Sequence, residues 1–161
     1  MLEGKSLKEL LRLYLDILRE LRRRELIRDG NGPAGGIAEM LVSRALDLTL
    51  ATNANQGLDA LGKDGTRFQI KARVLARTNG PRQMGAIRGL EKNQFDFLAC
   101  VIFDRNFEIF RAVLIPHSLV TKHAKHQTHV NAARFMLKDS ILEDPEVEDI
   151  TQKLRNVFRA L

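Results

Sequence analysis

Residues 57–74 read GLDALGKDGTRFQIKARV, and the alternation within this stretch decides the fold. Phe68, Ile70 and Ala72 alternate with polar side chains, which is the period of two that a β-strand requires. A short strand at 58–61 should precede it, joined by a turn at 62–65. We therefore expect a β-hairpin whose returning strand, 66–74, has one apolar and one polar face.

The next apolar run, 95–103, is almost free of polar side chains, which is typical of a central strand covered on both faces. Its connection to 66–74 is long enough for a crossover, so we expect the two strands to be parallel neighbours. Apolar positions from Met84 to Leu90 predict a crossover helix in that connection. The remaining expectations are a strand at 107–114, a short helix from Pro116 and an edge strand at 132–137.

Helical periodicity predicts three longer helices. The first, at 6–28, is amphipathic, with Leu7, Leu10, Leu11, Tyr14, Leu18 and Leu21 on one face. The second, at 33–48, begins at Pro33 and has Glu39 at the edge of its apolar arc. The third has Asp144 as its N-cap and Pro145 in its first turn. The sequence thus predicts a single α/β domain over 1–161, with a mixed central sheet flanked by helices, an extra N-terminal helix and a C-terminal helical extension at 116–161.

Composition narrows the class of protein. No stretch approaches the roughly 20 apolar residues that a membrane-spanning helix requires, and the charged N-terminus is unlike a secretory signal. The single cysteine, Cys100, lies in the apolar run and is expected to be a buried core thiol. These features predict a cytoplasmic protein with no membrane partner.

The positive charge is concentrated in one segment. Residues 67–92 contain seven Lys and Arg side chains and one acid, whereas the rest of the chain has 19 basic and 19 acidic side chains. Such a segment favours a polyanionic partner, and DNA is the expected one. The candidate phosphate contacts are Arg73, Arg77, Arg82, Arg88 and Lys92.

The polar face of strand 66–74 adjoins a set of oxygen ligands. Gln69 and Lys71 leave the same face, and Asp59 lies on the preceding strand. Glu39 comes from a helix expected to cover the sheet, and an acid at the edge of a buried face needs a partner or a metal. Two carboxylates and an amide carbonyl suit Mg²⁺ or Mn²⁺, and a neighbouring lysine can orient water or phosphate.

Glu39 on a helix, Gly57-Leu58-Asp59-Ala60, and Phe68-Gln69-Ile70-Lys71 together resemble the PD-(D/E)XK superfamily of restriction-endonuclease-like nucleases. The resemblance covers about 33–115 and implies an αβββαβ core. It also implies that Asp59 and Gln69 are metal ligands, Lys71 is the catalytic lysine and Glu39 is an accessory acid. This copy has Leu58 where the family has proline, and Gln69 where it has an acid.

The resemblance implies a divalent-metal-dependent deoxyribonuclease. A non-catalytic DNA-binding or assembly module that kept the fold is the alternative, because Gln69 removes one negative charge from the site. A homodimer built through helix 6–28 is a third hypothesis. His123, His126 and His129 recur every three residues without a nearby cysteine, which favours a polar surface over a zinc site.

Overall fold

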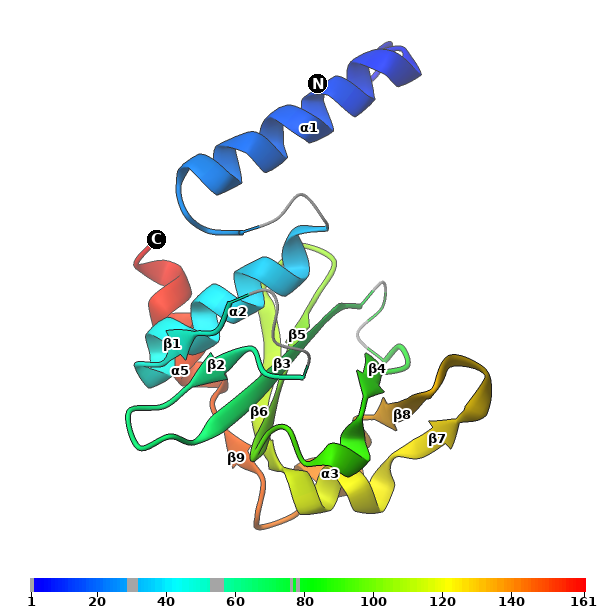
Figure 1. The fold of residues 1–161 in the computed structure, drawn as a ribbon. Helices are drawn as coiled ribbons and strands as arrows, with labels where there is room; N and C mark the ends of the chain where they lie inside the picture. The colour runs from blue at the N-terminus through cyan, green and yellow to red at the C-terminus, as the bar shows by residue number, and fades with distance from the viewer. Residues whose placement is uncertain (1, 29–31, 53–56, 76, 78) are drawn as a thin grey trace.

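The computed structural model describes residues 2–28, 32–52, 57–75, 77 and 79–161, without the side chains of residues 7, 8, 11 and 130 (Figure 1). Its larger sheet, sheet A, has six strands. In spatial order they are β1 (Thr49–Leu50), β2 (Ala60–Leu61), β3 (Arg67–Val74), β5 (Phe97–Phe103), β6 (Ile109–Pro116) and β9 (Glu148–Asp149).

The centre of sheet A is the pair β3 and β5. The two strands are parallel, with Gln69 beside Leu98 and Lys71 beside Cys100, whereas the other neighbouring strands of sheet A are antiparallel. The predicted hairpin of β2 and β3 is confirmed, and its turn closes with Gly62 N–H donating to the Thr66 carbonyl at 2.8 Å. The expected parallel neighbourhood of the hairpin strand and the apolar run is also confirmed.

A second sheet, sheet B, takes the place of the predicted crossover helix. Its strands are, in spatial order, β4 (Gln83–Arg88), β8 (Ala132–Met136) and β7 (Lys125–Gln127). Met84 and Ile87 are both buried because a bulge lies between them, and their spacing of three imitates a helix in the sequence. A single 3-10 turn, η1 (Leu90–Lys92), follows β4. The expected edge strand at 132–137 is instead the middle strand of sheet B.

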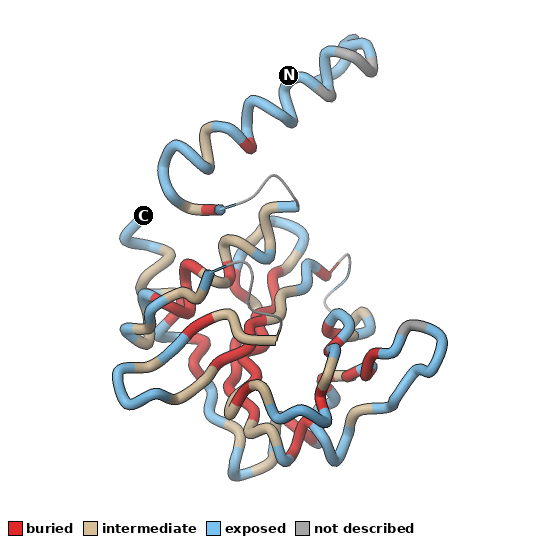
Figure 2. The backbone as a smooth tube through the Cα atoms, in the orientation of Figure 1, coloured by how far each residue is buried: buried red, intermediate tan, exposed pale blue. Residues whose placement is uncertain are grey.

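The N-terminal helix α1 (Leu7–Arg23) is shorter than predicted and largely exposed (Figure 2). It ends because Glu25 has a φ of 58° and Leu26 N–H donates back to the Leu21 carbonyl at 3.0 Å. Of its expected apolar face Leu18 is buried, whereas Leu10 and Tyr14 are exposed; the side chains of Leu7 and Leu11 lie outside the described part. Homodimerisation through α1 therefore stays a prediction.

Helix α2 (Pro33–Leu46) begins at Pro33 as predicted and ends where Asp47 adopts a left-handed conformation, with φ 54°. It packs on sheet A together with the last helix, α5 (Thr151–Arg159), through a core that includes Leu41, Ile70 and Leu154. The opposite face of sheet A packs against sheet B and α3 (His117–His123). The molecule is therefore layered as helices, sheet A, and sheet B with α3 (Figure 1).

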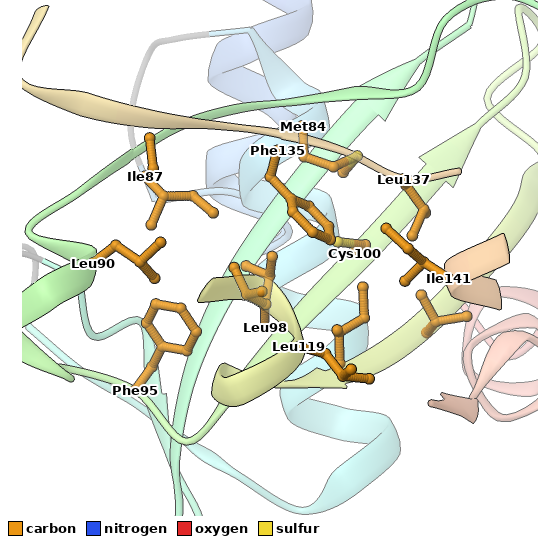
Figure 3. Close-up of a cluster of buried hydrophobic side chains, with 14 of the residues drawn as sticks. Met84, Ile87, Leu90, Phe95, Leu98, Cys100, Leu119, Phe135, Leu137 and Ile141 are labelled. Carbon is orange, nitrogen blue, oxygen red and sulfur yellow. The ribbon is translucent and has the colours of Figure 1, made fainter. Parts of the chain in front are cut away.

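The core between the two sheets contains the single cysteine. In Figure 3, Met84 and Phe135 from sheet B gather with Leu98 and Cys100 from β5. Burial raises the pKa of the Cys100 thiol, which keeps it neutral. The prediction of a buried core thiol is confirmed.

The C-terminal third is not the helical extension that the sequence predicts. Besides α3 it contains β7, β8, β9, the 3-10 turn η2 (Thr128–Val130) and the short helix α4 (Asp139–Leu142). The Asp144 carboxylate accepts the Glu146 N–H at 2.9 Å in a turn, and not at the start of a helix. Helix α5 begins only at Thr151, whose N–H donates to Asp149 at 2.8 Å. The N-cap of this helix is Ile150, and the Asp149 carboxylate that accepts the Thr151 N–H lies five residues after Asp144.

Candidate functional site

Strand β3, which carries Gln69 and Lys71, presents alternate side chains to the helix layer and to sheet B. Phe68 and Ile70 join the core beneath α2, so the alternating residues Gln69 and Lys71 leave the face that looks toward sheet B. Gln69 is 5% exposed, and its Oε1 is buried with no hydrogen-bond partner in the described part of the chain. A buried acceptor without a partner is unfavourable by about 1–3 kcal/mol, so this atom is suited to a ligand that donates or carries positive charge.

Asp59 lies immediately before β2, and its backbone and side chain both contact β3. Its N–H donates to the Phe68 carbonyl at 2.9 Å, and its Oδ2 accepts the Ile70 N–H at 2.6 Å. The carboxylate is therefore held beside the step from Gln69 to Ile70. The sequence predicted that Asp59 lies near β3, and the structure places it against the backbone of Phe68 and Ile70.

The charge of Asp59 is poorly solvated. Burial raises the pKa of its carboxyl above the ordinary aspartate value, while the Ile70 N–H and the charges of Lys71 and Arg28 oppose that rise. The ionised carboxylate is therefore unfavourable in the folded chain even though two cations lie near it. A bound cation would relieve the same penalty, which is how a partly buried acid serves as a metal ligand.

Glu39, on α2, has a protein partner that the sequence did not reveal. Arg28 Nη2 donates to Glu39 Oε2 at 2.5 Å, and Arg28 Nη1 donates to the Ala51 carbonyl at 2.6 Å. Arg28 is thus bonded both to the Glu39 carboxylate and to the backbone at Ala51. Its only signal in the sequence was that Glu39 needed a partner, because the contact spans 11 residues and joins α2 to a segment that lies beyond the end of α1.

The residues fit a divalent cation in part. Within the described ranges no group of three or more His, Cys, Asp and Glu side chains is arranged to hold a metal ion. An amide oxygen can also bind a metal ion, and Gln69 Oε1 is a buried acceptor that lacks a partner among the described residues. Gln69 and Asp59 would hold the cation, and Glu39 would contribute only when Arg28 releases its carboxylate or through a bridging water.

The basic segment 67–92 separates into two groups. Arg67 pairs with Asp96 at 2.8 Å, and Arg82 Nε donates to the Leu137 carbonyl at 2.8 Å while its Nη2 pairs with Asp139. These two guanidinium groups are therefore engaged in contacts within the fold. Arg73 donates weakly to the Gln83 carbonyl, at 3.2 Å.

Three cations of the same segment are free to meet a ligand. Arg77, Arg88 and Lys92 are exposed and have no ion pair or hydrogen bond to their side chains among the residues described. Arg88 ends β4 and Lys92 ends η1, so both lie on the connection between β3 and β5. This connection supplies unpaired positive charge beside the site strand.

Comparison with known proteins adds no relative. No protein-family model matches the chain, and no curated protein matches it. None of the helices in the described ranges is long and apolar enough to cross a membrane. Function is therefore inferred from the arrangement of the residues themselves.

The raised pKa of Asp59 predicts that the fold gains stability when this charge is removed. Because folding favours the protonated carboxyl, the ionised form destabilises the chain above the raised pKa. Asp59→Asn should therefore raise the melting temperature at pH 7 by a few degrees, the shift that about 1 kcal/mol produces in a chain of this size. The gain should disappear as the pH falls below about 3.9, the ordinary aspartate pKa.

Thermal unfolding followed by circular dichroism between pH 3 and pH 8 measures this effect. Asp47→Asn is the matched control, because the Asp47 carboxylate is 79% exposed in a surface ion pair and should leave the melting temperature nearly unchanged. A melting temperature at pH 7 that is lower for Asp59→Asn than for the natural chain would contradict the assignment of an unfavourable buried charge.

Proposed function

We propose that this chain is a divalent-metal-dependent deoxyribonuclease. The observation that carries the proposal is the buried Oε1 of Gln69, which has no partner among the described residues. Gln69 shares a strand face with Lys71, and the Asp59 carboxylate accepts the N–H of the next residue after Gln69, Ile70. Phosphodiester hydrolysis uses such a set of neighbouring groups: an acceptor oxygen, a partly buried acid and a lysine.

The order of the elements supports the same assignment. Helix α2, the antiparallel β1, β2 and β3, and the parallel neighbour β5 follow the first helix, three strands and parallel strand that the PD-(D/E)XK resemblance implies. The chain departs from that pattern between β3 and β5, where β4 and η1 stand in place of a helix. The restriction-endonuclease-like core is thus a proposal that rests on sheet order and on the residues of β3.

Each residue has a chemical role in the proposal. When bound, Mg²⁺ or Mn²⁺ would polarise the phosphoryl oxygens and make water more acidic. Asp59 and Gln69 would hold the cation, and Lys71 would orient a phosphoryl oxygen or the attacking water through its ammonium group. Hydrolysis then joins the water oxygen to phosphorus and releases a sugar hydroxyl. Glu39 would act through its ion pair with Arg28, whose charge lies near the Asp59 carboxylate.

DNA would be held by the unpaired cations of the connection between β3 and β5. Arg77, Arg88 and Lys92 are exposed, and Arg73 has only one long hydrogen bond. We assign Arg82 to the fold instead, because its side chain is 20% exposed and bonded to the Leu137 carbonyl and Asp139. This assignment replaces its expected role as a phosphate contact.

One alternative has an observation in its favour. Gln69 contributes no charge where the resemblance implies an acid, and Arg28 occupies a carboxylate oxygen of Glu39. A site with one acid available would bind a cation weakly. A non-catalytic DNA-binding or assembly module with this fold is therefore the second candidate function.

The proposed DNA contacts predict the salt dependence of binding. Replacing Arg77, Arg88 or Lys92 singly by alanine should lower the slope of log affinity against log salt by about 0.9 each on duplex DNA. Arg82→Ala is the contrasting variant. It should leave that slope unchanged and reduce the free energy of unfolding by about 1–3 kcal/mol, because the Leu137 carbonyl loses its donor.

Fluorescence anisotropy over a salt titration gives the slopes, and urea unfolding gives the stability. Unchanged slopes for all three variants, together with a reduced slope for Arg22→Ala, would place the DNA-binding surface on α1 instead.

The proposed catalytic roles predict a separation of cleavage from binding. Asp59→Ala and Lys71→Ala should each lower the cleavage rate by roughly 10²-fold or more, and Asp59→Ala should bind DNA as well as the natural chain or better. Lys63→Ala is the matched lysine control, since Lys63 lies in the hairpin turn with an exposed ion pair to Asp47. Gln69→Glu should raise cleavage at low Mg²⁺ by restoring a charged ligand.

Cleavage is measured by gel on supercoiled and linear DNA with Mg²⁺ or Mn²⁺. If the natural chain and Gln69→Glu both bind DNA yet fail to cut duplex, single-stranded and branched DNA with either metal, the nuclease proposal is wrong. The binding-module function then takes its place.

A further inference from the structure

A second basic region lies outside the site strand and its connection. Residues 109–138 contain no Asp or Glu, but they contain five Lys or Arg side chains and all four histidines of the chain. Six acids follow in residues 139–149, so the two runs nearly cancel, with five positive charges against six negative ones, when charge is summed along the sequence. In the fold, β7 and β8 lie in sheet B whereas β9 joins sheet A, where Asp149 pairs with Arg111 of the basic run at 2.6 Å.

The cations of this region line a hollow of about 350 Å³ on sheet B and the end of α3. Its charged and titratable lining residues are His123, Lys125, His126, Arg134 and Lys138, and no acid lines it. None of these five side chains has an ion pair or hydrogen bond within the part of the chain that the structure describes. The β7–β8 hairpin that bears most of them projects from the body of the molecule (Figure 1).

The hairpin also sets two like charges against each other. Lys125 on β7 is the direct cross-strand partner of Arg134 on β8, so their side chains leave the same face. Like charges in this position destabilise a strand pair, and no acid among the lining residues offsets them. The arrangement becomes favourable when an anion lies between the two cations.

We propose that this face of sheet B, defined by Lys125, Arg134 and Lys138, binds the phosphate backbone of duplex DNA as a second contact surface. The proposal rests on the proposed function, because it extends the same substrate beyond the site. The cations come from two strands and the segment after β8, which suits successive phosphates of a backbone better than one small anion. The hollow is lined by no Phe, Tyr or Trp, the rings that form most stacking platforms for single-stranded bases.

Single replacements of Lys125, Arg134 and Lys138 by alanine test the proposal. Each should weaken duplex binding roughly 5–10-fold near 0.1 M salt and lower the log–log salt slope by about 0.9. Lys125→Ala should also raise the melting temperature of the free chain, because it removes the like-charge pair. This second readout excludes misfolding as the cause of weaker binding. Arg159→Ala, an exposed arginine on α5, is the control and should change neither quantity.

The outcomes separate this inference from the function on which it rests. If the three variants bind duplex DNA with an unchanged slope while Arg77, Arg88 and Lys92 variants lose affinity, the second surface is overturned and the nuclease proposal stands. Variants that lose affinity for inorganic phosphate, but not for duplex DNA, would make the hollow a small-anion site and overturn the inference as well. A natural chain that binds no DNA at all overturns both proposals.

Discussion

The pairing of β3 with β5 governs the rest of the structure. Strand β5 is buried on both faces, so its neighbour β3 must present apolar side chains to α2 while its alternate residues face sheet B. This constraint places Gln69 in the interior, where its amide oxygen has no donor among the residues that the structure describes. A leucine at that position would suit the core between the sheets, and the polar side chain is retained at a cost in stability. The proposed role of Gln69 as a metal ligand would account for that cost.

The electrostatics of the site follow from the same geometry. Asp59 is drawn against β3 by the Ile70 N–H, and the burial that results raises the pKa of its carboxyl. Arg28, from the segment before α2, and Lys71, on β3, supply positive charge near this carboxylate, and Arg28 already holds Glu39. Arg28 and Lys71 therefore offset the charges of Glu39 and Asp59 at the place where the resemblance implies a metal ion. Cation binding and the Arg28–Glu39 pair are expected to compete.

Local patterns were sufficient to predict the hairpin, α2 and the buried strand, because each depends on periodicity within a few residues. The same periodicity failed at Met84 and Ile87, where a bulge places residues three apart on one strand face. The acidic run at 144–149 misplaced the start of α5, because a turn and a helix both use an aspartate that accepts a nearby N–H. At the candidate site, Asp59, Gln69 and Lys71 were predictable from strand geometry. The contact between Arg28 and Glu39 was not, because it joins side chains 11 residues apart and no local periodicity predicts it.

The central claim is that Gln69 and Asp59 hold a divalent cation, and Mn²⁺ binding followed by electron paramagnetic resonance tests it without requiring catalysis. Titrating Mn²⁺ into the natural chain should reveal one bound ion per chain, and Gln69→Leu should weaken its binding roughly tenfold or more, a typical loss when a group that supports a metal site is removed. Gln83→Leu, on β4, should bind as the natural chain does. A natural chain that binds no Mn²⁺, or a Gln69→Leu variant that binds it equally well, would contradict the account.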